Sequence, residues 1–347
     1  MAEVKPLTNS ETAAFCSQMA MILKSGISSN EGLILMSEDA AGDEEKKILE
    51  AANQVLMETG SLHQAVKATG IFPDYMVSMV RIGEETGTLD TVMQSLSAYY
   101  SREAGLAQTI KNAITYPFIM ILLMIAVILI LLTKVMPIFA QVFAQLGMSM
   151  GTVAKFFLAA GSFFSRNIIV LLILLVLLAA LAAYFTLTSS GQKAFLRFAG
   201  TFKPAGHLSE HISAYRFASG MALTLSSGLT PETSMEMACE LVENSAFASK
   251  LNKCRSDVSA GRDLCRSLLE NQVFSGVNTR LVSIASKTGS IDQAMDDIAL
   301  QYEEEIDRRI DSMLASIEPT LVIILSVLVG AILLSVMLPL LSIMSSL

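Results

Sequence analysis

Few residues in this sequence have the types and spacing that catalysis or metal binding requires. His207 and His211 lie four residues apart, so on a helix they would share one face, with Glu210 beside them. Two imidazoles without a third ligand do not make a zinc site, and an exposed polar face explains them better. Three cysteines have spacings that fit no zinc motif, and we expect them to be buried thiols: Cys239, Cys254 and Cys265.

The sequence also lacks the common nucleotide-binding and nucleophile motifs. The nearest string to a phosphate-binding loop is Ser286-Lys287-Thr288-Gly289, which lacks the preceding glycine and the strand context. No G-x-S-x-G or H-E-x-x-H string occurs. The net charge of −8 argues against a nucleic-acid partner. We therefore predict a protein that is not an enzyme, with no catalytic residue, no cofactor and no metal site.

The composition instead indicates a membrane protein. Hydrophobic residues make up 52% of the chain and charged residues only 16%, against about 25% charged residues in soluble domains. Three stretches carry no charge: from Lys111 to Lys134, from Arg166 to Lys193, and after Glu318. Each is long enough for the roughly 20 residues of a membrane-spanning helix. The first residues contain no apolar signal sequence, so we expect the N-terminus to stay in the cytosol.

The basic residues predict the orientation of these three spans. The loop between the first two spans holds only Lys134, Lys155 and Arg166. The other side holds seven basic residues near the membrane ends: Arg102, Lys111, Lys193, Arg197, Lys203, Arg308 and Arg309. Because basic residues concentrate in cytoplasmic loops, the larger polar segments are predicted to be cytosolic and the C-terminus to lie outside.

The polar segments contain an internal repeat. The string FCSQMAMILKSG from Phe15 aligns with FASGMALTLSSG from Phe217, with seven of 12 positions identical and a shift of 202 residues. The same shift, without a gap, pairs Phe72 with Phe274, Gly87 with Gly289, Pro117 with Pro319 and Pro137 with Pro339. We interpret this as duplication of a bundle followed by a membrane helix. The unpaired second span returns the chain to the cytosol between the two copies.

Each polar segment has the helix start and stop signals of a six-helix bundle. Thr8 and Glu11 form a capping box, Gly26 ends the first helix, and Ser28 with Glu31 starts a second helix that should run to about Ala41. The residues predicted to make structural turns are Gly26, Gly87, Gly228 and Gly289, together with Pro117 and Pro319 at the entrances to two spans.

The predicted fold is an all-α integral membrane protein with two tandemly repeated six-helix cytosolic bundles and three transmembrane helices. The predicted segments are the first bundle at 1–112, a transmembrane helix at 113–136, a short extracytoplasmic loop at 137–166, a second transmembrane helix at 167–188, the second bundle at 189–317, a third transmembrane helix at 318–341 and an extracytoplasmic tail at 342–347.

Acidic residues are the candidate contacts for partner proteins. Glu318 lies at the inner end of the third span, where it could face water or contact another helix. The acidic string Glu303, Glu304, Glu305 and Asp307 could dock a basic partner or form a solvated helix face. The sequence leaves both alternatives open.

Several short motifs, in this order and spacing, resemble those of a known family. The pattern G-E-x-[ST]-G-x-L occurs at residues 83–89 and recurs in degraded form at 285–291. Tyr116-Pro117 and Glu318-Pro319 precede two of the spans, and L-x-S-G-[IL] ends helices at 23–27 and 225–229. Over residues 8–340 the chain resembles the F/PilC-type inner-membrane platform proteins of type II secretion, type IV pilus and competence pseudopilus systems.

The resemblance implies a function and partners. Such a protein, located in the bacterial plasma (inner) membrane and forming homo-oligomers, would couple a cytosolic hexameric ATPase to the polymerisation of pilin or pseudopilin subunits. It would contact the transmembrane helices of those subunits and other inner-membrane assembly components. The candidate partner contacts are Glu84, Glu85, Glu303, Glu304 and Glu318. The alternative is a small membrane transporter or channel component, which the scarcity of polar residues in the spans disfavours.

Overall fold

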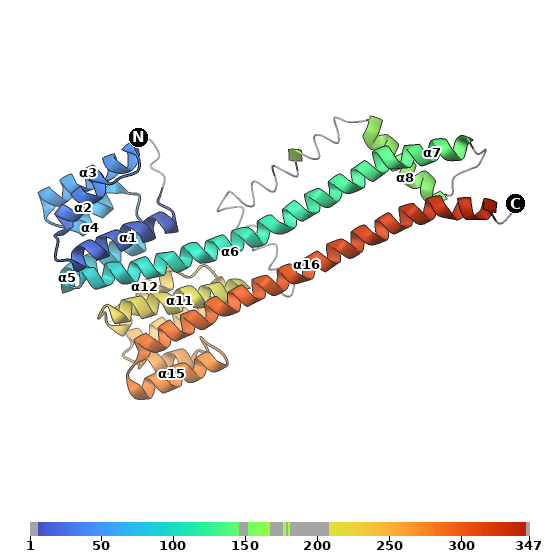
Figure 1. Cartoon of the computed structure of the whole chain (residues 1–347). Helices are drawn as coiled ribbons and strands as arrows, with labels where there is room; N and C mark the ends of the chain where they lie inside the picture. The colour runs from blue at the N-terminus through green and yellow to red at the C-terminus, as the bar shows by residue number, and fades with distance from the viewer. Residues whose placement is uncertain (1–5, 146–151, 167–175, 178–179, 181–207, 345–347) are drawn as a thin grey trace. The chain divides into compact units, whose positions relative to one another are not determined.

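The computed structural model describes residues 6–145, 152–166, 176–177, 180 and 208–344, and within them every regular element is a helix (Figure 1). The predicted all-helical fold is confirmed. The chain divides into two compact units. The bundle unit combines Met1–Gln108 with Gly206–Ile306, and the span unit combines Thr109–Ala205 with Asp307–Leu347.

The bundle unit contains two similar series of helices. The first is α1 (Asn9–Lys24), α2 (Ser29–Glu38), α3 (Asp43–Thr59), α4 (Leu62–Thr69), α5 (Asp74–Thr86) and the beginning of α6 (Leu89–Ile130). The second is α11 (Leu208–Ser226), α12 (Pro231–Glu240), α13 (Ser245–Ser259), α14 (Leu264–Glu270), α15 (Val277–Thr288) and the beginning of α16 (Ile291–Met344). The starts of α2 and α12 lie 202 residues apart, as do those of α3 and α13, α4 and α14, and α6 and α16.

Local capping signals set the helix boundaries. The Thr8 side chain accepts from the backbone N–H of Glu11 while the Glu11 carboxylate accepts from Thr8, so the predicted capping box is confirmed. Helix α5 ends at Gly87, whose φ of 72° places it in the left-handed region that only glycine adopts without strain. Gly26, Gly228 and Gly289 also have positive φ. The second helix ends at Glu38, three residues before the predicted end.

The two helix series share buried apolar contacts. In the first series, the rings of Phe15 and Phe72 have centroids 4.7 Å apart, and Tyr75 and Tyr99 are 5.5 Å apart. The core around these rings also includes Leu223 of α11, which belongs to the second series. Because one apolar cluster takes residues from both series, the bundles form a single packed unit rather than two separate domains.

Two equivalent positions show how the repeats pack differently. A Cβ added to Gly83 would lie 3.1 Å from the Leu89 Cα and 3.2 Å from the Val92 Cβ. The residues 202 positions later are Ala285 and Ala294, which are both buried. The second series therefore has a methyl group where the first has none, and a smaller residue facing it. The loss at position 294 thus offsets the added methyl group at position 285, with a net decrease of one side-chain carbon.

The span unit contains the long apolar helices. Helix α6 continues through a π-helical turn, η1 (Leu131–Val135), into α7 (Met136–Gln145). Helix α8 (Thr152–Arg166) packs against η1, where a Cβ on Gly161 would lie 2.1 Å from the Leu132 carbonyl oxygen. Residues 137–166, which were predicted as a loop, therefore lie mostly in the two helices α7 and α8. Their apolar side chains, including Phe143 and Ala154, form a buried cluster with Ile332 of α16.

The structure differs from the predicted turns at Pro117 and Pro319. Helices α6 and α16 continue through both residues. A proline removes one backbone hydrogen bond, whereas ending the helix would expose several unpaired N–H and carbonyl groups. In apolar surroundings nothing else can pair with those groups, so a continuous helix is the less costly solution.

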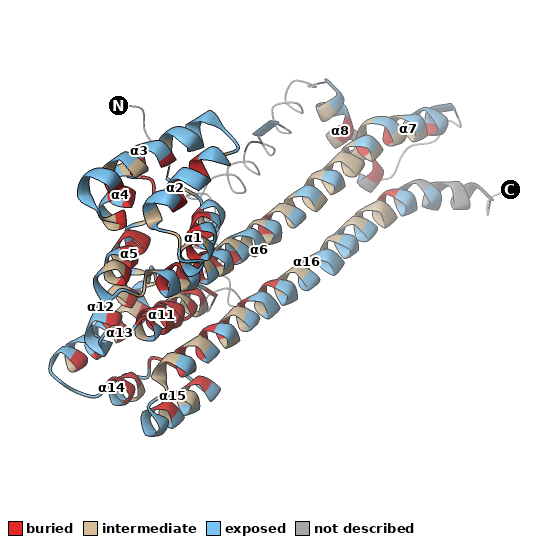
Figure 2. Cartoon of the chain, turned by 60° about the vertical axis from the view of Figure 1, so that its left-hand side comes forward, coloured by how far each residue is buried: buried red, intermediate tan, exposed pale blue. Residues whose placement is uncertain are grey.

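Two of the three predicted spans lie in the described residues. The continuous helices Leu89–Gln145 and Ile291–Leu334 are long and apolar enough to cross a membrane. Figure 2 shows many pale exposed residues along the later parts of α6 and α16, and large apolar side chains such as Ile323 and Val327 are 62% and 66% exposed. The predicted span at 167–188 lies outside the described residues, apart from Val176, Leu177 and Ala180.

The first prediction concerns the Gly83 contact. Gly83→Ala should lower the free energy of unfolding by about 1–3 kcal/mol, because the added methyl group overfills this site. Adding Val92→Ala should recover part of the loss, as the Ala285–Ala294 pair suggests. Chemical denaturation of the four proteins of the double-mutant cycle in detergent measures the coupling. Strictly additive effects would show that the two sites do not interact.

Candidate functional site

The residues considered for catalysis are engaged in structural contacts. The Nε2 atom of His211 lies 3.2 Å from an oxygen of Glu305, and the Glu210 carboxylate pairs with Lys250 at 3.0 Å. His207 lies outside the described residues. Among the described residues, no group of three or more His, Cys, Asp or Glu side chains has the geometry to hold a metal ion.

The remaining chemical motifs also have structural roles. Ser286 to Gly289 form the C-terminal end of α15, where carbonyls rather than N–H groups point outward, so the string cannot cradle a phosphate. Cys254 and Cys265 are buried and Cys239 is half-buried. Burial raises the pKa of Cys254 to about 12 and that of Cys239 to about 11. Thiols with such pKa values are poor nucleophiles at neutral pH.

Glu84, a candidate partner contact, caps a helix within the first series. Its carboxylate accepts hydrogen bonds from the backbone N–H groups of Leu62 and His63, the latter at 3.1 Å, and from the Ser61 hydroxyl at 2.7 Å. These groups form the N-terminus of α4, whose first N–H groups have no partner within the helix. A carboxylate from α5 thus stabilises the start of α4.

The second series places the equivalent carboxylate on a different residue. The position 202 residues after Glu84 is Ser286, which has no charge. Its α14 begins instead at Asp263, whose carboxylate accepts from the backbone N–H of Arg266 at 2.8 Å. Asp263 corresponds to Ser61. Both helices therefore have a carboxylate at their N-terminus. Because Asp263 supplies it in the second series, position 286 needs no acid, and the two G-E-x-[ST]-G-x-L motifs differ there.

The other acidic candidates lie on more open surfaces. Glu85 is exposed, with an oxygen 3.9 Å from the Nε atom of Arg81. Glu303 is half-buried, and Glu304 and Glu318 are exposed. The structure does not bring these five acidic residues into one cluster: they lie on α5 and at separate positions along α16.

A buried ion pair that sequence analysis did not identify joins the two helix series. Arg216 of α11 contacts both oxygens of Glu103 on α6, with Nε–Oε1 at 3.3 Å and Nη2–Oε2 at 3.1 Å. The Glu103 side chain is only 7% exposed. A third group, the carboxylate of Glu243, lies 3.6 Å from Nη1 of the same guanidinium. This two-pronged geometry fixes both distance and orientation.

Further polar contacts lie beside this pair. The Tyr75 hydroxyl donates to the Gly220 carbonyl at 3.4 Å, and Arg102 donates to Asp296 at 3.1 Å. The Glu103–Arg216, Tyr75–Gly220 and Arg102–Asp296 contacts each connect residues at least 100 positions apart in the sequence, and none belongs to a recognisable motif. The only sequence signal was an acidic or basic residue within an otherwise apolar helical face, such as Arg216 between Tyr215 and Phe217.

The electrostatics of the ion pair favour its charged form. Burial alone would lower the pKa of Arg216, but the neighbouring Glu103 carboxylate raises it above its ordinary value. The Arg216 guanidinium therefore stays charged at physiological pH. Its contacts with Glu103 are suited to holding α6 against α11.

The second prediction concerns the Glu84 cap. Glu84→Gln should lower the free energy of unfolding by about 1–2 kcal/mol, because it replaces a charge-assisted hydrogen bond at the α4 N-terminus with a weaker one. Adding Ser61→Asp should restore stability by copying the arrangement at Asp263. Urea unfolding followed by circular dichroism provides the measurement. If the second substitution gave no recovery, the carboxylate would not be the stabilising element.

The third prediction concerns the Glu103–Arg216 pair. Glu103→Gln should destabilise the protein by about 1–3 kcal/mol, because the half-buried Arg216 would lose its two-pronged carboxylate partner and keep only Glu243. The double variant Glu103→Leu with Arg216→Met should lose less, since no uncompensated charge remains. Thermal unfolding of the full chain measures both. Glu270→Gln, which removes an exposed pair with Arg266, is the control and should have no measurable effect.

The chain matches known proteins over nearly its whole length. The profile of a family described as type II secretion system (T2SS), protein F, matches residues 15–137 and again residues 217–339. The type IV pilus assembly protein PilC of Thermus thermophilus is 27% identical, covering 97% of this chain and 83% of that protein. PilC of Pseudomonas aeruginosa is 24% identical, with 97% and 90% covered.

A type II secretion protein matches an equally large share of this chain. The type II secretion system protein F of Xanthomonas campestris is 22% identical, and the match covers 97% of this chain and 83% of that protein. The two profile matches together take in more than half of the chain and include the turn at Gly87, the buried pair residue Glu103 and both long apolar helices. The chain therefore belongs to the type II secretion system protein F family.

Proposed function

We propose that this protein is a non-enzymatic assembly platform in the bacterial inner membrane. It would couple a cytosolic hexameric ATPase to the polymerisation of pilin or pseudopilin subunits in a type IV pilus, type II secretion or competence system. The observation that carries the proposal is the family match over residues 15–137 and 217–339, together with relatives named for type IV pilus assembly and type II secretion.

The proposal includes an architecture of two repeated units. The two profile matches are themselves 202 residues apart, the same shift that relates the starts of α2 and α12. We propose that each copy supplies a six-helix cytosolic bundle and one span, and that the span at 167–188 connects them. The N-terminus and both bundles would be cytosolic, and the C-terminus would lie outside.

Continuous helices offer a mechanical route from the bundles to the membrane. Helix α6 carries Glu103 in the bundle unit and continues to Ile130, and α16 carries Asp296 and continues to Met344. An α-helix resists bending and stretching because each turn is closed by backbone hydrogen bonds. A displacement of the bundles by an ATPase would therefore reach the apolar residues that contact subunits in the bilayer.

The alternative function, a small transporter or channel component, has less support. Transport pathways usually keep ionisable groups within the membrane. In the apolar parts of the two described span helices, Lys134 and Glu318 are the ionisable residues, and each lies towards an end. The relatives named above are assembly and secretion proteins, and none of their names describes a transporter of small molecules.

The fourth prediction tests the function in cells. Deleting the gene should abolish surface filaments or pseudopilus-dependent secretion, and the wild-type gene should restore them. Glu318→Gln should reduce assembly while the protein remains in the membrane at normal abundance, because this exposed residue at the start of the apolar stretch suits a contact with another helix. Immunoblots of sheared filaments and of membranes provide the two readings.

Two results would count against the proposal. Normal filaments and secretion in the deletion strain would exclude a platform role. Appreciable ATP hydrolysis by the purified protein would exclude a non-enzymatic one. Normal assembly by the Glu318→Gln variant would leave the platform role intact and support the alternative that Glu318 faces water.

A further inference from the structure

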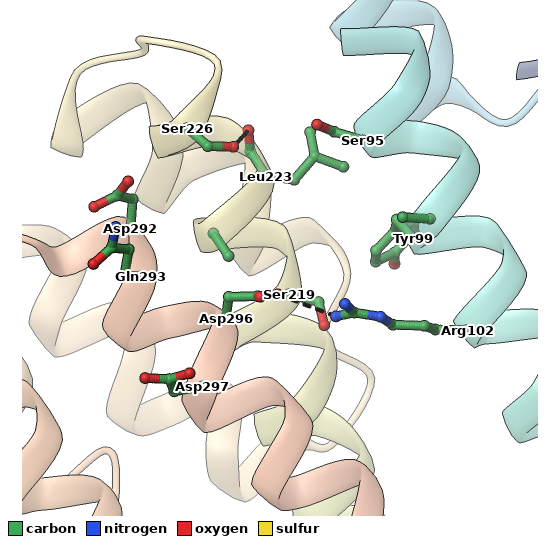
Figure 3. A pocket seen from close by; sticks show the side chains of 12 residues that line it. Ser95, Tyr99, Arg102, Ser219, Leu223, Ser226, Asp292, Gln293, Asp296 and Asp297 are labelled. Atoms are coloured by element: carbon green, nitrogen blue, oxygen red, sulfur yellow. Dashed lines mark hydrogen bonds and ion pairs between the residues drawn. The ribbon is translucent and has the colours of Figure 1, made fainter. Parts of the chain in front are cut away.

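The contact between the two helix series uses a different face of each series. Tyr75 of α5 donates to the Gly220 carbonyl of α11. Leu223 of α11 belongs to the apolar cluster of the first series, and Met237 of α12 packs against that cluster. Figure 3 shows Ser95 of α6 opposite Leu223. The first series thus contributes a face of α5 and α6, and the second contributes a face of α11 and α12.

The repeat shows that this contact has no two-fold symmetry. A symmetric contact would also bury the counterparts of its residues, which lie 202 positions away. Tyr75 is 8% exposed, but its counterpart Val277 is 61% exposed. Leu223 is 6% exposed, but its counterpart Met21 is 69% exposed. The contact is therefore heterologous, and it leaves one matching face uncovered on each series.

The uncovered face of the second series lies on α15. Leu281 and Ile284 follow Val277 by four and seven residues, so the three side chains share one side of this helix. Leu281 is half-buried and Ile284 is 58% exposed. Their counterparts on α5 are Met79, which is fully buried, and Ile82, which is half-buried against the shared cluster. We call these three residues of the second series the α15 face.

The uncovered face of the first series lies on α1 and α2. It consists of Gln18 and Met21 on α1 and Leu35 on α2, and all three are exposed. Leu35 is the counterpart of Met237, which packs against the shared cluster. We call these three residues the α1/α2 face. Its apolar side chains stand where the second series uses apolar side chains to hold the first.

The two uncovered faces match each other in size at the position of the Tyr75–Gly220 contact. The counterparts of these residues are Val277 and Gln18. A smaller apolar residue replaces the tyrosine, and a longer side chain replaces the glycine. The two pairs have the same number of non-hydrogen side-chain atoms, so the second pair can fill the same space.

The two faces also match in charge. Ser95 of α6 and Ser226 of α11 line the same cleft between the two series (Figure 3). Their counterparts are Asp297 and Lys24, which are both exposed. A neutral pair within the chain thus corresponds to a pair of opposite charges between the uncovered faces, and opposite charges favour their association.

We propose that the α15 face of one chain docks on the α1/α2 face of a second copy, in the arrangement that joins the two series within one chain. Each added copy again leaves one face of each kind, so copies add until a ring closes. The Glu103–Arg216 pair has no counterpart there, because Ala14 takes the place of the arginine. The contact between copies should therefore be weaker than the one within the chain. This inference goes beyond the proposed function, since it is drawn from the repeat.

The fifth prediction tests the contact by cross-linking. Gln18→Cys and Val277→Cys are combined in the full chain, with Cys239→Ser to remove the one native cysteine that is not buried. Bismaleimidoethane added to isolated membranes should then give covalent dimers and larger species. When the two cysteines are on separate, co-expressed chains, only dimers should form, because each chain then offers one thiol.

Single variants and a matched pair are the controls. Each single variant expressed alone should stay monomeric, because a heterologous contact keeps identical residues of two chains apart. Glu50→Cys with Val277→Cys should give at least tenfold less product. Glu50 is exposed on α3, and its counterpart Asn252 on α13 is exposed as well, so this position takes no part in the contact between the series.

Substitutions at exposed apolar residues measure the strength of self-association. Met21→Glu should weaken association of the purified chain at least fivefold, because it places a charge in an apolar contact. The unfolding temperature should not fall, since the side chain is 69% exposed in the single chain. Met57→Glu on α3 adds the same charge at a residue that is 70% exposed, and should leave association unchanged. Analytical ultracentrifugation in detergent provides the measurement.

A charge reversal tests the relation between the two faces. Lys24→Glu should weaken association two- to fivefold, because it places two negative charges together. Adding Asp297→Lys to the same chain should recover the loss, because the pair then forms between copies with its signs exchanged. The same ultracentrifugation assay measures both variants.

The outcomes separate this inference from the proposed function. Cross-linking no greater than in the Glu50 control, or equal cross-linking by either single variant alone, would overturn the inference. So would equal losses of association in the Met21 and Met57 variants. If one of these occurred while gene deletion still abolished filaments, the platform function would stand without this contact. If the contact were found while filaments and secretion survived gene deletion, the inference would stand and the platform function would not.

Discussion

The rest of the structure depends on the need to keep backbone hydrogen bonds intact where polar bundles give way to apolar segments. A chain entering lipid has no water to pair with its N–H and carbonyl groups, so it must satisfy them internally. Helices α6 and α16 meet this need by continuing without a break from bundle to apolar residues. The same constraint explains why Pro117 and Pro319 do not end their helices.

Continuity gives these two helices a double role. Their first turns complete the cores of the bundles, where Val92, Leu96 and Met295 are fully buried. Their later turns expose apolar side chains. The charged contacts Glu103–Arg216 and Arg102–Asp296 fix the polar part of α6 against α11 and α16.

The repeat shows which features the fold requires and which it can exchange. A carboxylate at the start of α4 comes from Glu84 and that at the start of α14 from Asp263. The methyl group absent at Gly83 is present at Ala285, where Ala294 replaces the valine of the first copy. In each case the physical requirement is kept while the residue changes.

The sequence alone determined the helical class, most helix ends and the two described spans. These features depend on residues close together in the chain, such as Thr8 with Glu11, Gly87 after α5, or an uninterrupted apolar stretch. It also suggested the family through the order of short motifs. The tertiary structure decided the role of Glu84 and the burial of Glu103 with Arg216. Those depend on side chains that are up to 200 residues apart, and only packing brings them within hydrogen-bonding distance.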